Sequence, residues 1–203
     1  SREPHCASRG GFVIVSKPIT TMTQETALEI LKTGANVFLT GEPGSGKTHT
    51  VNRYVAYLRS HDIEPAITAS TGIAATHIGG MTVHSWSGIG IRKEFSHDDI
   101  LAIAGKRTAS RIARTKVLII DEISMLDARM LSGIEAVCRA IKENEEPFGG
   151  MQVVLVGDFF QLPPVNAENE GAEFAFLSSA WEAADIAVCY LSEQYRQEDE
   201  AFF

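Results

Sequence analysis

The sequence has few cysteines and no long apolar run. Its three cysteines, Cys6, Cys138 and Cys189, are widely separated and form no Cys-x-x-Cys pair, so we expect reduced thiols rather than a zinc or redox centre. No stretch approaches the roughly 20 apolar residues of a membrane-spanning helix, and the N-terminus lacks the order of a signal peptide. We therefore expect an intracellular protein with no membrane partner.

Basic residues are also scarce, with 18 Lys and Arg against 26 Asp and Glu and a net charge of -8. This balance argues against a protein that coats nucleic acid. The charge is uneven, however: residues 47–116 hold 10 basic and 5 acidic side chains, a balance of +5, and the remaining residues hold 8 and 21. A local basic face is one interpretation, and solvated helix surfaces are the interpretation that charge alone favours.

The length and composition indicate one globular domain, or at most one domain with a small appendage. The chain has 203 residues, of which 44% are hydrophobic, enough for a sizeable core. Residues 1–10 have little periodicity and resemble a leader or cloning remnant, so we assign the domain to residues 11–203.

The most informative stretch is Gly-Glu-Pro-Gly-Ser-Gly-Lys-Thr at residues 41–48, which fits the phosphate-loop pattern. A buried strand is predicted before it at residues 36–40, and helical spacing follows it. Backbone N–H groups of such a loop and the positive helix terminus point at phosphate oxygens, while Lys47 reaches the outer phosphates and Thr48 offers its hydroxyl to Mg²⁺. The candidate ATP-binding residues here are Gly41, Pro43, Gly44, Ser45, Gly46, Lys47 and Thr48.

Strand and helix patterns alternate along the chain. We expect strands at residues 36–40, 66–69, 117–120, 153–156 and 186–191, and helices from Thr23 to Gly34, after the phosphate loop, from Ser70–Gly72, around residues 100–112 at the surface, and over residues 128–142. This alternation predicts an α/β fold with a mainly parallel central sheet and helices on both faces. Ligands of such sheets bind beyond the carboxyl ends of the strands.

Two polar clusters join the phosphate loop at that edge. Asp121 and Glu122 follow an aliphatic strand, where Asp121 is placed to hold Mg²⁺, directly or through water, and Glu122 to polarise a water that attacks the terminal phosphate. Gln161 lies on the segment that leaves the next strand. Its amide can donate to a phosphate oxygen and accept from water, so it can sense the terminal phosphate. The catalytic candidates are thus Lys47, Asp121, Glu122 and Gln161.

Several further motifs accompany these residues between about Thr23 and Gln197. Together with the phosphate loop they are Ala69–Ala75, Ile78–Trp86, Asp121–Leu126 with a signature helix to Lys142, Pro147–Gly150, Gly157–Val165 and Gln194–Gln197. With this combination the chain resembles the petite-integration-frequency (Pif) family of superfamily 1 DNA helicases. The resemblance implies a RecA-like P-loop NTPase domain that uses ATP and Mg²⁺.

It also implies a function and partners. Such a motor moves 5′ to 3′ on single-stranded DNA and unwinds duplex, forked or structured DNA, in DNA repair, recombination or telomere maintenance. A monomer is expected, in a bacterial cytoplasm or a eukaryotic nucleus or mitochondrion. A second motor domain follows in the family, and the present residues are expected to lack it and therefore to be poor at hydrolysis and unable to unwind DNA.

Further site residues follow from the resemblance alone. Gln24 would read adenine, and Arg196 would touch the terminal phosphate. The DNA-tracking residues would be Thr71, Gly72, Thr82, His84 and Trp86. Small polar groups of this kind grip phosphates and flat rings stack on bases.

Other functions remain open at this point. A RecD-type or conjugative-relaxase helicase shares the phosphate loop and a Gly-Asp-x-x-Gln-Leu-Pro-Pro segment. An AAA-type ATPase that remodels a protein partner is a second alternative, although its strand-tip sensor is more usually Asn than Gln161. A small-molecule kinase is a distant third, because no acceptor-site motif is visible.

Overall fold

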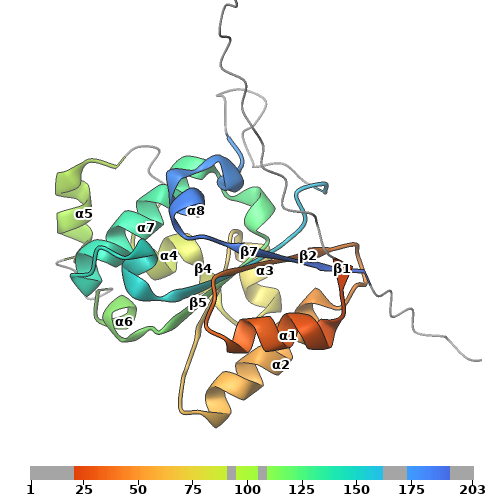
Figure 1. Ribbon diagram of the computed structural model, residues 1–203. Coiled ribbons are helices and arrows are strands. Elements are labelled where there is room, and N and C mark those ends of the chain that lie inside the picture. The colour runs from red at the N-terminus through yellow and green to blue at the C-terminus, as the bar shows by residue number, and fades with distance from the viewer. Residues whose placement is uncertain (1–20, 91–94, 105–108, 162–172, 193–203) are drawn as a thin grey trace, which may run out of the picture.

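The computed structural model describes residues 21–90, 95–104, 109–161 and 173–192, which form one seven-stranded sheet with helices on both faces (Figure 1). The strands are β1 (Thr21–Met22), β2 (Val37–Gly41), β3 (Ala66–Ala69), β4 (Met81–Thr82), β5 (Val117–Asp121), β6 (Gln152–Val156) and β7 (Ala187–Leu191). Their order across the sheet is β1-β7-β2-β6-β5-β3-β4, and every neighbouring pair is parallel. The predicted parallel α/β fold is confirmed.

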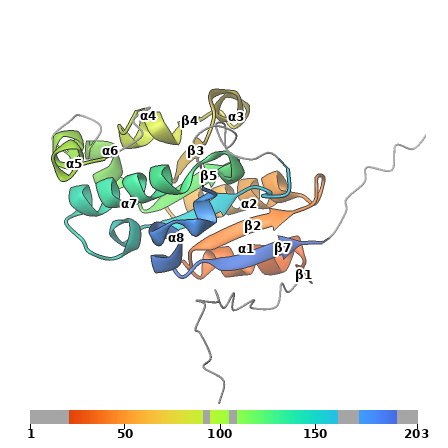
Figure 2. The same ribbon diagram turned by 90° about the horizontal axis from the view of Figure 1, so that it is seen from above.

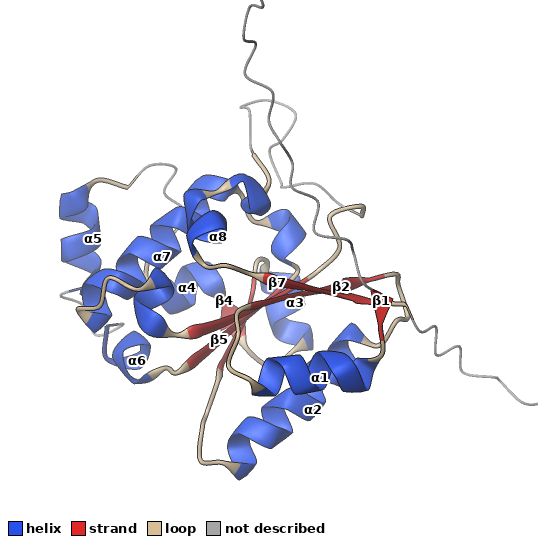
Figure 3. Cartoon of the chain, in the orientation of Figure 1, coloured by secondary structure: helices blue, strands red, loops and turns tan. Residues whose placement is uncertain are grey.

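Eight α-helices and three short 3₁₀ turns connect the described strands (Figure 3). The helices are α1 (Gln24–Lys32), α2 (Lys47–Ser60), α3 (Gly72–His77), α4 (Val83–Ser87), α5 (His97–Ala104), α6 (Ala109–Arg114), α7 (Ala128–Lys142) and α8 (Ser179–Ala183). The 3₁₀ turns are η1 (Ile123–Met125), η2 (Pro147–Gly150) and η3 (Ala175–Leu177).

Alternate residues of the central strands feed two separate cores. In β5, Leu118 and Ile120 pack in the cluster that includes α7 and α8, whereas Val117 and Ile119 pack in the cluster that includes α1 and α2. The strand is therefore buried on both faces, which is why its sequence is a continuous aliphatic run. β2 and β6 divide their residues in the same way.

The carboxyl ends of these parallel strands lie at one edge. β2 pairs with β6, β6 with β5, and β5 with β3, all in parallel register. Figure 2 shows α3, α4 and β4 together on one side of the sheet and β1 on the other. The segments that leave β2, β3, β5 and β6 are thus brought together although they are far apart in the sequence.

Some elements differ from the expected ones. Where one helix was expected around residues 100–112, the structure has α5 and α6, and residues 105–108 between them are not among the described residues. This region is also not simply a surface helix, because Ile103 and Ile112 are buried. The two-residue strands β1 and β4 were not predicted, since two residues are too few to show a strand period. The other strands begin or end within one residue of their predicted bounds.

A buried polar network fixes α1 and α2 on the sheet. The Tyr54 hydroxyl donates to Gln152 Oε1, and Gln152 Nε2 donates to the carbonyls of Leu31 and Ala35. The side chain of Asn36 accepts from Val153 N and donates to Ala184 O. Buried polar groups require such partners, so this network holds the start of β6 against the ends of α1 and α8.

The two described cysteines are free and buried, as expected. Burial raises the pKa of the Cys189 thiol to about 11 and also raises that of Cys138, so both remain protonated and unreactive at neutral pH. Among the described residues, no helix combines the length and hydropathy that a membrane span requires.

Candidate nucleotide site and DNA-facing edge

The phosphate loop connects β2 to α2 as predicted. The helix starts at Lys47, and its N-cap, Gly46, has a left-handed φ of 87° and no capping side chain. The first N–H groups of α2 therefore lack a side-chain acceptor, which is the arrangement that favours an anion at a helix N-terminus. The left-handed backbone at Gly46 favours glycine, and a Cβ atom there would also displace the tip of the Gln24 side chain.

Gln24 lies against this loop although it belongs to α1. Its side chain is 7% exposed, and Nε2 donates to Ser45 O at 3.2 Å. The helix position follows from Thr23, whose hydroxyl caps α1 by accepting from Thr26 N. The residue that the resemblance implies for adenine is thus in direct contact with the loop that is predicted to bind phosphate.

Lys47 folds back over the loop. Its Nζ donates to Gly41 O at 2.7 Å and to Glu42 O at 3.2 Å. A phosphate oxygen that binds the ammonium group must compete with these carbonyls. The ammonium group then gains a negatively charged acceptor in place of two neutral ones.

One buried atom of the loop has no partner. Ser45 Oγ is among the few buried side-chain atoms of the described residues without a hydrogen bond. Orphaned buried hydroxyls are uncommon in proteins, and a phosphate oxygen would satisfy this one. The unpartnered hydroxyl, the uncapped helix and the Lys47 ammonium together fit a nucleotide phosphate group.

Asp121 and Glu122 lie at the end of β5, where two hydrogen bonds from Ser70 hold their backbone. Ser70 N donates to Asp121 O at 3.0 Å, and Ser70 Oγ donates to Glu122 O at 2.7 Å. Glu122 adopts a left-handed φ of 53°, and its N–H donates to Asp121 Oδ1 at 2.9 Å. The end of β3 therefore sets the conformation of the acidic pair.

Burial raises the pKa of both carboxyl groups. For Asp121 the hydrogen bond from Glu122 N and the charge of Lys47 oppose this rise. For Glu122 the neighbouring Asp121 charge raises the pKa further, Lys47 lowers it and Asp158 raises it again. These interactions place Lys47, Asp158 and the acidic pair in one electrostatic environment, and a raised pKa brings a carboxylate closer to the range of an effective general base.

Gln161 is held by a turn after β6. Asp158 Oδ1 accepts from Phe160 N at 2.9 Å, and Asp158 Oδ2 accepts from Gln161 Nε2 at 3.0 Å. Phe159 anchors the turn by packing on Phe38 and Trp181. The Gln161 amide is exposed, with its nitrogen oriented by Asp158.

The residues predicted for Mg²⁺ form a small set. Thr48 and Asp121 line the same cavity, although no cluster of three or more His, Cys, Asp or Glu side chains suited to a metal occurs in the described part of the chain. Mg²⁺ at nucleotide sites needs only one or two protein oxygens, because phosphates and waters complete its shell. The pair therefore fits a magnesium–nucleotide complex better than a metal bound by protein alone.

Three predicted DNA residues lie at the start of two short helices. Thr71 caps α3 by accepting from Ala74 N at 3.2 Å, and Thr82 caps α4 by accepting from Ser85 N at 3.2 Å. Gly72 is exposed at the first position of α3, and nothing lies within 4 Å of a Cβ atom built on it. Because β3 and β4 are parallel neighbours, both helix starts face the same edge.

The two predicted stacking residues differ in position. His84 is half-buried, and burial lowers its pKa while Asp127 opposes this, so the ring is neutral at neutral pH. Trp86 is only 3% exposed and packs in the core beneath α7. Its ring leaves little surface for a base, so we assign Trp86 a packing role in this structure, and its contact with DNA stays a prediction.

Several predicted features lie outside the described residues: Arg196, the segment 1–10, and the last part of the Gly157–Val165 motif.

The basic segment at residues 47–116 is described except for residues 91–94 and 105–108. Arg53 pairs with Glu25 and Arg59 with Glu64, so these two charges are neutralised locally. These two pairs are typical of solvated helix faces, whereas Arg111, Arg114 and Lys116 line one pocket together.

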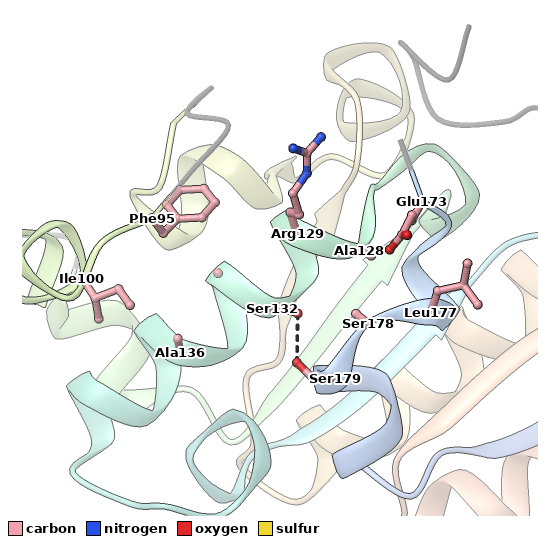
Figure 4. Close-up of a pocket in the computed structure, with 11 residues that line it drawn as sticks. Phe95, Ile100, Ala128, Arg129, Ser132, Ala136, Glu173, Leu177, Ser178 and Ser179 are labelled. Carbon is pink, nitrogen blue, oxygen red and sulfur yellow. Dashed lines mark hydrogen bonds between the residues drawn. The ribbon is translucent and has the colours of Figure 1, made fainter. Parts of the chain in front are cut away.

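A larger hollow of about 600 Å³ lies elsewhere, along α7 between Phe95 and α8 (Figure 4). Arg129 and Glu173 border it, and the hydroxyls of Ser132 and Ser179 lie 3.4 Å apart in its lining, where α7 meets α8. It contains no residue of the phosphate loop or of the acidic pair, so it is separate from the nucleotide site.

Comparison with known proteins decides the family. Residues 19–202 match the family model described as PIF1-like helicase. This chain belongs to that family. It is 55% identical over 180 residues to the ATP-dependent DNA helicase Pif1 of Psychrobacter sp. (strain PRwf-1), covering 87% of this chain and 27% of that protein. It is 43% identical over 191 residues to the ATP-dependent DNA helicase RRM3 of Saccharomyces cerevisiae, covering 91% of this chain and 26% of that one.

Solved structures support the RecA-like fold. Pif1 helicase from Candida albicans superimposes with a TM-score of 0.79 at 39% identity, covering 89% of this chain and 41% of that one. Pif1 from Bacteroides sp. in complex with ADP-AlF4 gives 0.73 at 32% identity, covering 86% and 42%. The chain thus spans about a quarter of these curated relatives and less than half of these solved chains.

Sequence reasoning gave no role to Ser70 or Asp158. Both are polar residues within two positions of the end of a strand, which was the available signal, but their hydrogen bonds to Glu122 and Gln161 depend on strand order and turn geometry. Both hold candidate catalytic residues in position.

The packing role of Trp86 predicts a loss of stability on truncation. Trp86→Ala should lower the free energy of unfolding by about 3–5 kcal/mol, because it removes a large buried ring and leaves a cavity. Urea denaturation measures this change. The control is Ile73→Ala on α3, which is 77% exposed and should have little effect. Unchanged stability with weaker DNA binding would instead restore the stacking role.

The raised pKa of Glu122 predicts a pH-dependent gain in stability for Glu122→Gln. The folded state binds this proton more tightly than the unfolded state, so its stabilising contribution is present below the ordinary pKa of 4.5 and is lost as pH rises through the raised value. At neutral pH the Gln variant should therefore melt at a higher temperature than the wild type, and below pH 4.5 the difference should vanish.

Calorimetry across this pH range tests the prediction, with Glu25→Gln as control. The pKa of Glu25 is lowered by its hydrogen bond and ion pair with Arg53. Removing this carboxylate in Glu25→Gln should therefore not raise the melting temperature at neutral pH. A Glu122→Gln variant that is less stable than the wild type at neutral pH would contradict the desolvation argument.

Proposed function

We propose that the chain is the ATP-binding and ATP-hydrolysing motor domain of a DNA helicase that tracks 5′ to 3′ on single-stranded DNA. The observation that carries this proposal is the meeting of the phosphate loop, the acidic pair and the Asp158–Gln161 turn at one sheet edge. Relatives named ATP-dependent DNA helicases support it, as does a solved Bacteroides Pif1 in complex with ADP-AlF3 and single-stranded DNA.

In this proposal each polar group has a separate role. The N-terminus of α2 and Lys47 bind the phosphates, and Thr48 and Asp121 hold Mg²⁺. Bound there, Mg²⁺ neutralises charge on the phosphate oxygens. Glu122 orients the attacking water and accepts its proton, since its pKa is raised toward neutrality. Gln161 senses the terminal phosphate, Gln24 reads adenine, and Arg196 completes the phosphate contacts.

The DNA would run along the edge that carries α3 and α4. Thr71, Gly72 and Thr82 present small groups and backbone N–H that suit phosphate contacts. His84 is the remaining candidate for contact with a base. A solved structure concerns DNA unwinding at forked double-stranded DNA by two Pif1 helicases, which supports forked DNA as a substrate. Because relatives occur in bacteria and in yeast, the proposed compartments are the bacterial cytoplasm and the eukaryotic nucleus or mitochondrion.

We also propose that these 203 residues alone bind nucleotide but do not unwind DNA, since they cover only 41% of a solved Pif1 chain. A strand-displacement assay on a forked duplex tests this, and clear unwinding would refute it. Membership of the PIF1-like family makes the RecD-type and AAA-type alternatives unnecessary.

Replacing Lys47 tests the nucleotide site. Lys47→Ala should leave the fold intact and abolish measurable binding of a fluorescent ATP analogue, with a loss of about 100-fold or more, because charge-assisted hydrogen bonds to phosphate disappear. Lys32→Ala is the matched control, since Lys32 pairs with Glu29 on α1. Glu122→Gln should retain binding and lose hydrolysis by about 10²–10⁴-fold. Unchanged affinity in Lys47→Ala would show that the nucleotide binds elsewhere.

A charge placed at Gly72 tests the DNA edge. Gly72→Glu should fold normally, because the site is open and a negative charge is favourable at a helix N-terminus, yet it should repel DNA phosphates. We expect binding of fluorescent single-stranded DNA to weaken about tenfold at low salt, and less at high salt. Gly72→Gln has the same shape without the charge and should bind nearly as the wild type. Equal DNA affinity for both variants would remove α3 from the interface.

A further inference from the structure

A small cavity lies between α2 and α3 and borders the nucleotide site at Thr48, the last residue of the phosphate loop, and at Asp121. Its volume is about 150 Å³. Six aliphatic side chains from α2, three strands and the residue that follows α3 form most of its lining: Val51, Val55, Ile67, Ile78, Ile119 and Val156. We call it the α2–α3 cavity.

Polar groups complete the lining on the helix side and at the end of β5. Thr48 and Asn52 come from α2, His77 from the end of α3, and Asp121 from β5. Thr48, Asn52 and His77 are exposed, whereas Ile119 and Val156 are buried. The cavity therefore has an apolar floor on the sheet and a hydrogen-bonding rim near solvent.

We propose that the α2–α3 cavity binds a small molecule with one aromatic ring and one hydrogen-bonding substituent. Protein interiors are normally packed without voids of this size, and an aliphatic cavity of about 150 Å³ accepts benzene. Water inside it would find few partners against the aliphatic floor, so a ring displaces it favourably. The substituent pairs with the rim.

The position of the cavity couples it to both candidate sites. An occupant touches the helix that begins at Lys47 and the last residue of the helix that begins at Gly72, and it borders Thr48 and Asp121. It therefore restrains α2 and α3 relative to each other and alters the affinity for magnesium–nucleotide. This coupling depends on the proposed function, whereas binding of the ring does not.

Phenol is the probe for the binding test. Phenol is titrated without nucleotide into protein with labelled Ile and Val methyl groups, and chemical shifts are recorded. The expected result is saturable shifts of the cavity methyls, with Ile73 on the outer surface of α3 unaffected. Ile78→Phe fills the cavity and should weaken phenol binding at least about tenfold. Ile73→Phe adds the same ring at a site that is 77% exposed and should bind phenol as the wild type does.

Overpacking can unfold a variant, so Val51→Leu provides a second, smaller filling from α2. Absence of saturable shifts up to the solubility limit of phenol overturns the proposal, as does equal binding by the wild type and both folded filling variants.

Nucleotide titration with and without saturating phenol then tests the coupling. An unchanged nucleotide affinity refutes the coupling, and a protein that binds phenol but no nucleotide refutes the proposed function while leaving the cavity site in place.

Discussion

Parallel pairing of β2, β6, β5 and β3 is the constraint on which the candidate site depends. In each strand, the polar residues of the candidate site lie only at its end or in the short segment that follows it. None of these segments forms a site by itself. Parallel register aligns them at one edge, so Lys47 and Asp158 both act electrostatically on Glu122 despite their distance in sequence. An antiparallel neighbour would place one of these segments at the opposite edge.

The acidic pair shows a conflict between folding and chemistry. Burial and mutual repulsion raise the pKa of Glu122, which disfavours its charged form in the folded protein. A carboxylate with full solvation would cost less but would be a weaker base. Ser70 and the left-handed backbone of Glu122 hold the pair in this unfavourable position, which is typical of functional sites.

Patterns with a local cause could be predicted from the sequence. The aliphatic run of β5, the Thr23 cap and the glycine loop each depend on neighbouring residues, and the structure has all three. Features that depend on distant partners could not be predicted. Trp86 follows a polar segment that resembles a DNA-binding loop, but its burial depends on α7, whose residues come more than 40 positions later. The hydrogen bonds of Gln152 to α1 likewise required the strand order.

Contacts within the phosphate loop suggest how base and phosphate recognition are joined. Gln24 donates to Ser45 O, and Lys47 donates to Gly41 O and Glu42 O, so side chains assigned to the base and to the phosphates both bond to the same loop backbone. In the proposed site, adenine that takes the Gln24 amide would release Ser45 O, and phosphate that takes Lys47 would release Gly41 O. Because the two carbonyls are four residues apart in one loop, we expect each event to alter the backbone that the other must contact, so the two halves of a nucleotide would bind interdependently.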